Sequence, residues 1–214
     1  MSLHFRHVLR RTAVLLGAGL VSLTLARPAA AKPKPAKTVE DLHTAARIES
    51  NARARYLAFA QKADAEGFGE VASLFRAAAR AEEIELSNQS AVLKKLGAVD
   101  YPAAVDTPVV KSTRENLTAA AAPREGYSAE TFADFTKTAK AASNQDAATA
   151  FFYAEESWGQ NEILFHKALV NLNHMKGKSH TYYVCSVCGY TAEQPVPQTC
   201  GTCKNRAEKY EAVN

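Results

Sequence analysis

Residues 38–66 read TVEDLHTAARIESNARARYLAFAQKADAE, and this stretch decides the fold class. Apolar residues recur in it every three or four positions, which is the spacing of one face of an α-helix. The residues of this face are Leu42, Ala45, Ala46, Ile48, Ala52, Tyr56, Phe59 and Ala60. Thr38 can cap the start, with Asp41 three residues later, and Gly67 can end the helix. The stretch therefore predicts a long amphipathic helix that packs against other helices.

The segments that follow repeat this pattern. A second helix is predicted from Glu70 to Leu96, with Gly97 as its stop signal. Residues 98–111 contain two prolines and predict a long crossover rather than a helix. The crossover leads to Ser112, which is the first residue of a capping box at the start of a third predicted helix.

The third and fourth helices complete the predicted bundle. Ser112 and Glu115 form the capping-box pattern, and Pro123 interrupts the helix that follows before it resumes. A fourth helix is predicted over residues 144–175. Four long helices with one long crossover predict a mainly α fold, a ferritin-like four-helix bundle over residues 38–176.

Composition supports a helical protein and argues against nucleic acid and anionic membranes as its partners. The chain of 214 residues is 47% hydrophobic but only 8% aromatic. Its formal charge of +4 comes from four arginines in residues 1–31, a segment that has no acidic residue. Without that segment the chain carries 22 basic and 22 acidic residues. A neutral body gives no electrostatic reason to expect nucleic acid or an anionic membrane as a partner.

Residues 1–31 resemble a targeting segment. A basic region ends at Arg10-Arg11, an apolar stretch follows, and Ala29-Ala30-Ala31 forms a small-residue cleavage pattern. The adjacent arginines fit twin-arginine export; an ordinary secretory signal and an uncleaved anchor are the alternatives. We expect a periplasmic or otherwise exported protein without a membrane segment after cleavage, in which residues 32–37 act as a linker.

The tail carries two Cys-x-x-Cys motifs. Cys185, Cys188, Cys200 and Cys203 are the only cysteines in the chain, and eleven residues separate the two pairs. Two such knuckles can place four thiolates tetrahedrally around one metal ion, as in zinc ribbons and rubredoxin-type iron sites. A tail this short needs a metal ion or disulfides to fold, so two disulfides are the alternative. We predict a metal-binding domain over residues 182–214 after a linker at 177–181.

Several segments together resemble the rubrerythrin family. The tail sequence YYVCSVCGY at 182–190 is similar to its rubredoxin-like domain. ESNARARY at 49–56, LFRAAARAEE at 74–83 and TPVVKSTRENL at 107–117 are similar to its first three helices and their crossover. Gly201 departs from the family, which usually has proline after the third cysteine. The resemblance implies a di-iron site in the bundle, one iron in the tail, reduction of hydrogen peroxide, and at least a dimer with one chain's tail near another chain's bundle.

Carried over residue by residue, the resemblance preserves only part of the di-iron site. Glu49 and Glu82 match family ligands, and Glu85 stands where the family has histidine. A count without gaps puts Arg124 and Tyr127 at the two glutamate positions of the third helix, and a one-residue shift would put Glu125 there.

The fourth helix departs further from the family pattern. Its Glu-x-x-His pair becomes Trp158 and Asn161, and neither side chain is a suitable iron ligand. We therefore do not expect a di-iron centre. A single metal at the three remaining glutamates and a site without metal stay open. We also expect Arg124 to replace the positive charge of the metal and Trp158 to fill its volume.

Three functions follow from these expectations. The first is an exported iron-binding protein that transfers electrons through one iron at the four cysteines, with impaired peroxidase chemistry. The second is an active peroxide-reducing rubrerythrin, and the third is a zinc-ribbon interaction module. An electron-donor protein is a possible partner of the first. Whether the chain is an enzyme is left open by the sequence, because the family label and the lost ligands point in opposite directions.

Overall fold

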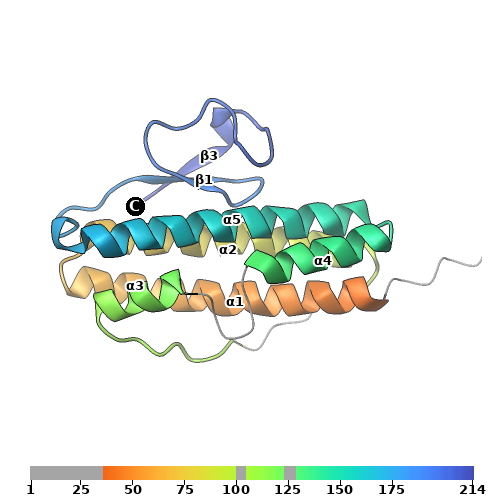
Figure 1. Ribbon diagram of the computed structural model, residues 1–214, viewed down its shortest axis with the longest axis horizontal. Helices are drawn as coiled ribbons and strands as arrows, with labels where there is room; N and C mark the ends of the chain where they lie inside the picture. The colour runs from red at the N-terminus through yellow and green to blue at the C-terminus, as the bar shows by residue number, and fades with distance from the viewer. Residues whose placement is uncertain (1–35, 100–104, 123–128) are drawn as a thin grey trace, which may run out of the picture. The chain divides into compact units, whose positions relative to one another are not determined.

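Two long helices that are adjacent in the sequence lie side by side at the centre of the fold (Figure 1). The computed structural model describes residues 36–99, 105–122 and 129–214. Helix α1 spans Ala36–Ala65 and helix α2 spans Gly69–Lys95. Gly67, at φ 77°, ends α1, and the N–H of Phe68 donates to the carbonyl of Ala63 at 2.8 Å. This left-handed residue lets the chain reverse direction within three residues.

Three more helices complete the bundle. Helix α3 spans Thr113–Ala121, and the capping box of Ser112 and Glu115 that the sequence predicts is present at its start. Helix α4 spans Ala129–Ala141 and α5 spans Gln145–Asn171, followed by a short 3-10 turn at Leu172–His174. The predicted third helix is thus two helices on either side of residues 123–128, which lie outside the described residues. The predicted mainly α, ferritin-like fold class is confirmed.

The core of the bundle is built from alanines and two groups of aromatic rings. Tyr56 and Phe165 pack together with Phe75, with ring centroids 5.2–6.1 Å apart. A second group surrounds Phe132, whose ring centroid is 5.3 Å from that of Trp158. Small alanine side chains between the rings let the helix backbones approach closely, so the interior fills without large residues at every position.

The tail is a small three-stranded sheet that packs on the bundle. Strand β1, Tyr182–Cys185, lies between β2, Thr191–Ala192, and β3, Tyr210–Val213, and pairs antiparallel with both. A 3-10 turn at Ala207–Lys209 precedes β3. The strands lie over α2 and α5 (Figure 1), and Tyr182 and Val184 are buried in the same apolar cluster as the first aromatic group. Residues 33–214 form one unit.

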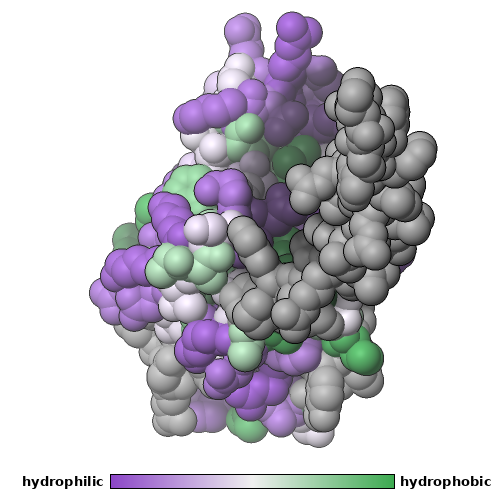
Figure 2. Space-filling model, turned by 90° about the vertical axis from the view of Figure 1, so that its right-hand side faces the viewer, coloured by the Kyte–Doolittle hydropathy of each residue, from purple (hydrophilic) through white to green (hydrophobic). Residues whose placement is uncertain are grey.

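The described surface on one face of the molecule is mostly polar. On the face in Figure 2, hydrophilic residues predominate and hydrophobic residues appear as separate small patches. Among the described residues, none of the helices combines the length and the hydropathy that a membrane span requires. The predicted targeting segment at 1–31 lies outside the described residues.

Candidate metal centres

The four cysteines of the tail sit on two knuckles of the same design. In the first, the N–H of Gly189 donates to the carbonyl of Cys185 at 2.9 Å. In the second, the N–H of Lys204 donates to the carbonyl of Cys200 at 3.0 Å. Gly189 and Lys204, each one residue after the second cysteine of its pair, both have positive φ, 78° and 61°. These tight turns place both cysteines of a pair on the same side of the loop.

The sulfur atoms form a compact set. The Sγ atoms of Cys185 and Cys203 are 3.6 Å apart, and so are those of Cys188 and Cys200. Four thiolates at about 2.3 Å from one metal ion have sulfur–sulfur distances of about 3.8 Å in a tetrahedron. A disulfide requires about 2.05 Å, and all four cysteines are free thiols. The geometry therefore suits one metal ion rather than two disulfides.

The four thiols differ in burial and in their hydrogen bonds. Cys185, Cys188 and Cys200 are fully buried, and Cys203 is partly exposed. A hydrogen bond with the Cys188 thiol lowers the pKa of Cys185 to about 5, and the same pairing raises the pKa of Cys188. The side-chain amide of Asn205 lies 3.4 Å from the Cys203 sulfur. Cys185 is thus biased toward the thiolate, whereas burial raises the pKa of Cys203.

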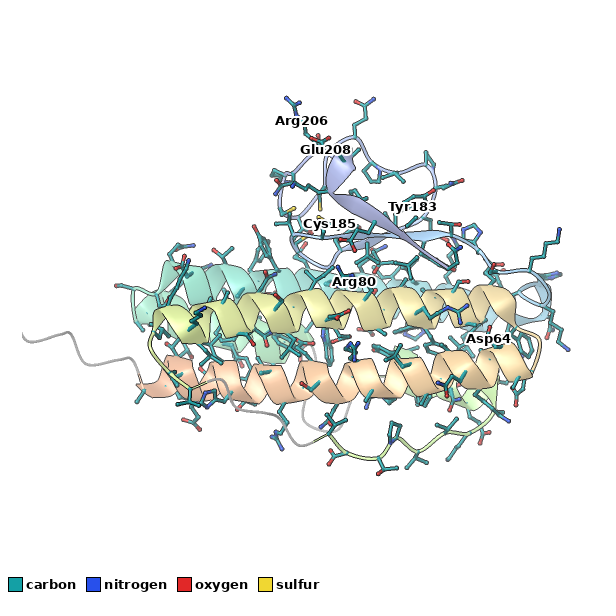
Figure 3. All side chains as sticks on the ribbon, turned by 180° about the vertical axis from the view of Figure 1, so that it is seen from behind. Asp64, Arg80, Tyr183, Cys185, Arg206 and Glu208 are labelled. Atoms are coloured by element: carbon teal, nitrogen blue, oxygen red, sulfur yellow. The ribbon has the colours of Figure 1, made fainter. Side chains whose placement is uncertain are left out.

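The bundle closes one side of this site. Tyr153 of α5 packs against the cysteine cluster together with Tyr190 and Tyr210 of the tail. The Asn88 side chain donates to the carbonyl of Val187 at 2.9 Å. Figure 3 shows Arg80 of α2 between that helix and the tail, where its guanidinium pairs with Glu211 at 2.9 Å. The tail therefore contacts the bundle of its own chain.

A second cluster of candidate ligands lies inside the bundle. Glu49 of α1 and Glu82 and Glu85 of α2 are at most 1% exposed, and one oxygen of each lies within 4.8 Å of the others. The spacing of three between Glu82 and Glu85 puts both on one helix face, as the sequence predicts. The three residues come from only two of the helices.

The indole of Trp158 reaches into this cluster. Its Nε1–H donates to Oε2 of Glu49 at 3.1 Å and to Oε2 of Glu82 at 3.2 Å. The Gln89 side chain donates to the other oxygen of Glu49 at 3.2 Å. Among the residues that the structure describes, neither oxygen of Glu85 has a hydrogen-bond partner. Trp158 thus does more than fill volume, because it holds two carboxyl groups together with one N–H.

The electrostatics of the cluster favour neutral carboxyl groups. Burial raises the pKa of Glu49, and it raises those of Glu82 and Glu85 well above their usual range, where the neighbouring carboxylates add to the effect. Arg55 acts in the opposite direction on Glu82. Burial also raises the pKa of Tyr56, so this phenol stays protonated beside the cluster.

Contact between the two clusters runs through Gly189. The hydroxyl of Ser157 donates to the Gly189 carbonyl at 3.1 Å. A Cβ atom at Gly189 would lie 2.7 Å from Oε1 of Glu85 and 3.2 Å from the hydroxyl oxygen of Ser157. The backbone of Gly189, one residue after Cys188, therefore contacts Glu85 of the bundle.

The structure places the other predicted site residues as follows. Asn161 is buried, and both polar atoms of its side chain lack a hydrogen-bond partner. Arg124 and Tyr127 lie outside the described residues, so the predicted pairing of Arg124 with the carboxylates stays a prediction. Sequence reasoning missed Arg55 and Gln89. Gln89 is four residues after Glu85 on the same helix, and this spacing is the signal that could have indicated it.

Known proteins are similar to this chain in sequence and in fold. The rubrerythrin family model matches residues 40–162. Rubrerythrin of Porphyromonas gingivalis is 27% identical over 184 residues, covering 84% of this chain and 92% of that protein. Nigerythrin of Nitratidesulfovibrio vulgaris is 24% identical over 176 residues, covering 82% and 86%. A structure of fully reduced nigerythrin superimposes with a TM-score of 0.71 at 21% identity, covering 94% of this chain and all of that one.

Proposed function

We propose, since this chain belongs to the rubrerythrin family, that it is an exported redox protein that transfers electrons through one iron ion held by its four tail cysteines. Members of the family bind iron. The observation that carries the proposal is the compact set of four sulfur atoms, which all lie within 4.8 Å of one another and are 3.6 Å apart in two pairs. Iron bound by four thiolates supplies a one-electron couple.

The surroundings of the cysteines fit this role. Tyr153, Tyr190 and Tyr210 pack around the sulfur atoms and limit access of water, which is one of the factors that set the potential of an iron–thiolate site. Cys203 is the cysteine left partly exposed. We propose that electrons enter and leave at this exposed side of the site.

The carboxylate cluster does not fit a di-iron centre, and we propose that peroxidase chemistry is impaired. A di-iron site of this fold draws a Glu from each of two helices and a Glu-x-x-His pair from each of the other two. Here the described residues supply three glutamates from α1 and α2, and α5 offers Trp158 and Asn161. The Trp158 N–H lies between Glu49 and Glu82 and donates to one oxygen of each. These two oxygens therefore accept a hydrogen bond where a di-iron site would have them bind metal.

Metal analysis with a visible spectrum and a peroxide assay tests these proposals. We expect one iron per chain and thiolate charge-transfer bands that vanish in Cys200→Ser. We also expect the rate of peroxide turnover to be no higher than the rate at which the reduced tail iron alone reacts with peroxide. Three irons per chain with rapid turnover would establish an active peroxide-reducing rubrerythrin, which family membership favours. Zinc alone, in protein made with both metals available, would establish a zinc-ribbon module.

Export is proposed from residues 1–31 alone. We expect the mature protein to begin at or near Lys32 when it is isolated from its native source. N-terminal sequencing checks this, and Arg10→Lys with Arg11→Lys checks the twin-arginine route. We also propose that the protein forms a homodimer, which the family resemblance implies. We propose further that an electron-donor protein is its redox partner.

A further inference from the structure

The second cysteine knuckle of the tail presents its loop to solvent. Cys203 is partly exposed, whereas the other three cysteines are buried. Gly201, two residues before Cys203, is exposed, and a Cβ atom built on it would meet nothing within 4 Å. No side chain therefore covers the loop at this position, and the surface of a second protein can approach its backbone closely.

Three basic residues border this loop. Lys204 follows the last cysteine directly, is exposed, and donates from its Nζ to a carbonyl of the same knuckle. Arg206 is exposed, and Figure 3 shows it at the outer edge of the tail, away from the helices. Lys209 is exposed too, and its carbonyl accepts a hydrogen bond from the N–H of Ser186 in the first knuckle at 2.8 Å. Positive charge therefore lies beside both knuckles.

Acidic residues leave most of this charge uncompensated. In the tail, Glu193 pairs with Lys167 of α5 at 2.7 Å, and Glu211 pairs with Arg80 of α2 at 2.9 Å. Both of these carboxylates are thus neutralised against the bundle. The remaining acid of the tail, Glu208, is exposed near the outer edge (Figure 3). Within residues 201–209, three positive charges therefore stand against one negative charge.

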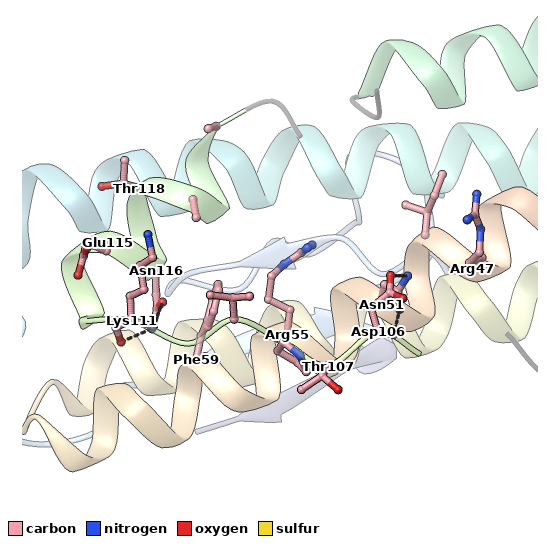
Figure 4. Close-up of a pocket in the computed structure, with 15 residues that line it drawn as sticks. Arg47, Asn51, Arg55, Phe59, Asp106, Thr107, Lys111, Glu115, Asn116 and Thr118 are labelled. Carbon is pink, nitrogen blue, oxygen red and sulfur yellow. Dashed lines mark hydrogen bonds between the residues drawn. The ribbon is translucent and has the colours of Figure 1, made fainter. Parts of the chain in front are cut away.

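The positive charge is specific to the outer end of the tail. On the side that faces the bundle, Tyr153 of α5 packs against the cysteine cluster, and Tyr190 is within electrostatic reach of Glu156 on the same helix. A cavity of about 900 Å³ lies between α1, residues 105–111 and α3 (Figure 4), and none of its lining residues belongs to the tail. A molecule bound in that cavity would not contact the knuckles.

We propose that the outer end of the tail, defined by Lys204, Arg206 and Lys209, is the docking surface for a one-electron redox protein whose own surface is acidic around its cofactor. This inference rests on the function proposed above and adds the chemistry of the partner. The electron that the partner's reduced cofactor loses is the one that the ferric site gains, so no bond forms or breaks and no proton moves. Complementary charges steer two such proteins into an orientation that brings the cofactor to the exposed side of Cys203.

Binding of one redox protein in two charge forms tests the proposal. Cytochrome c is basic, and succinylation converts its lysines to carboxylates while the haem stays the same. The purified protein is loaded with zinc, which four thiolates bind but which carries no electron, so that calorimetry measures docking alone. At a salt concentration of about 20 mM, we expect the succinylated form to bind about tenfold more tightly than the native form. Its affinity should fall about fivefold or more at about 200 mM salt, because the charges are exposed and screened.

Charge reversal separates this surface from the overall charge of the protein. Lys209→Glu and Arg206→Glu should each weaken binding of succinylated cytochrome c about fivefold, and Arg206→Lys should bind like the unmodified protein. Lys178→Glu is the matched control, because it makes the same charge change at an exposed linker residue that packs beside Gly69 at the start of α2. The first knuckle, in contrast, contacts Asn88 near the end of that helix. We expect Lys178→Glu to change the affinity less than about twofold.

Three outcomes would overturn the proposal. The first is the absence of saturable binding of the succinylated form at low salt, and the second is equally tight binding of native cytochrome c. The third is an equal loss of affinity in Lys209→Glu and Lys178→Glu, because binding would then follow net charge rather than this surface. All the replaced side chains are exposed, and one zinc per chain in each variant shows that the tail is folded. Failure of the proposed function is seen separately, as protein without iron in the metal analysis described above.

Discussion

At the scale of single residues, Glu85 is one of the poorly satisfied polar groups of the bundle. It is fully buried, and neither of its oxygens accepts a hydrogen bond. Trp158 and Gln89 donate to the neighbouring glutamates. In the absence of a metal ion, such a group costs stability whenever it is ionised.

Glu85→Gln is therefore expected to stabilise the protein at neutral pH. Burial raises the folded-state pKa of Glu85 above its ordinary value of 4.5. The native state then binds the proton more tightly than the unfolded chain, so this contribution is complete below about pH 4.5 and is lost as pH rises through the folded pKa. Removing the charge should raise the free energy of unfolding at pH 7.5 by about 1–2 kcal/mol and leave it nearly unchanged at pH 4.

Denaturant unfolding at the two pH values measures this, and Glu83→Gln is the matched control. Glu83 is on the same helix but half-exposed, and it pairs with Arg80 at 3.1 Å. Its replacement should give no gain at either pH. A loss of stability in Glu85→Gln at neutral pH would contradict the prediction and would point to a metal ion bound by the three glutamates.

Trp158 allows the protonation of the cluster to be followed directly. It is the only tryptophan in the sequence, and its N–H donates to Glu49 and Glu82. We expect its fluorescence to change with a midpoint above pH 4.5, because the pKa of Glu82 is raised by burial and by Glu49. Glu82→Gln should remove or displace this transition. Emission that is independent of pH between 4 and 9 would show that the carboxyl groups do not titrate beside the indole.

The residues of the two clusters differ in how far the sequence predicts them. The four cysteines and the pair Glu82 and Glu85 follow from spacing within one segment, and the register of α5 places Trp158 toward the glutamates. Arg55 is different, because its position on α1 faces away from the ligand stripe and only a long, flexible side chain brings its charge near Glu82. No local sequence pattern predicts that the Arg55 side chain extends toward Glu82.

At the scale of elements, the contact between the tail and α2 depends on the absence of a side chain at Gly189. Its backbone lies against Glu85 and Ser157, and its φ of 78° is one that other residues rarely adopt. The sequence indicates that glycine follows the second cysteine, and the knuckle turn explains the positive φ. The second reason, close approach to another helix, depends on how the tail packs and could not be predicted.

Gly189→Ala should therefore loosen the tail from the bundle. The added Cβ would lie 2.7 Å from Oε1 of Glu85 and 3.2 Å from the carbonyl oxygen of Ala81, so the glutamate side chain or the knuckle must shift. We expect faster hydrogen exchange at Val184 and Tyr183 and lower stability, by about 1–3 kcal/mol. Hydrogen exchange followed by mass spectrometry gives the measurement.

Two other glycines separate the causes of this effect. Gly201→Ala adds a Cβ where nothing lies within 4 Å, and it should leave exchange in the tail unchanged. Gly177→Ala also has open space, but its φ is 100°, so it reports the cost of backbone strain alone. If Gly189→Ala resembles Gly177→Ala in stability and leaves β1 protected, then close contact with Glu85 is not what positions the tail.

At the scale of the whole molecule, the two parts have different sources of stability. The bundle has extensive apolar clusters that include the Tyr56 and Phe132 groups. The buried cluster of the tail itself consists of Cys185, Cys188 and Cys200, while Tyr182 and Val184 belong to an apolar cluster of the bundle. Helical periodicity and cysteine spacing predict both parts, because each depends on local sequence. The packing of one part on the other depends on side chains that are more than 100 residues apart, such as Arg80 and Glu211.

Removal of the metal ion proposed for the tail should consequently unfold the tail and spare the helices. Without a metal ion, the centre of the tail consists of four thiols in close contact. A domain of about 30 residues cannot bury enough apolar surface to stay folded without a bound ligand. We expect a chelator to abolish amide protection in residues 182–213 while most of the helical circular dichroism signal remains. Simultaneous loss of both signals would mean that the bundle also depends on the metal.

The start of the linker is fastened to the turn between the first two helices. The N–H of Gly177 donates to the carbonyl of Gly67 at 2.9 Å, and the backbone of Gly69 packs so closely on Gly177 that a Cβ would collide with it. The tail thus begins its short tether from a fixed point, which keeps its local concentration at the bundle high and independent of dilution. Docking of the tail is then a unimolecular event, and the distance between the two clusters is the same at nanomolar protein as in a crowded compartment.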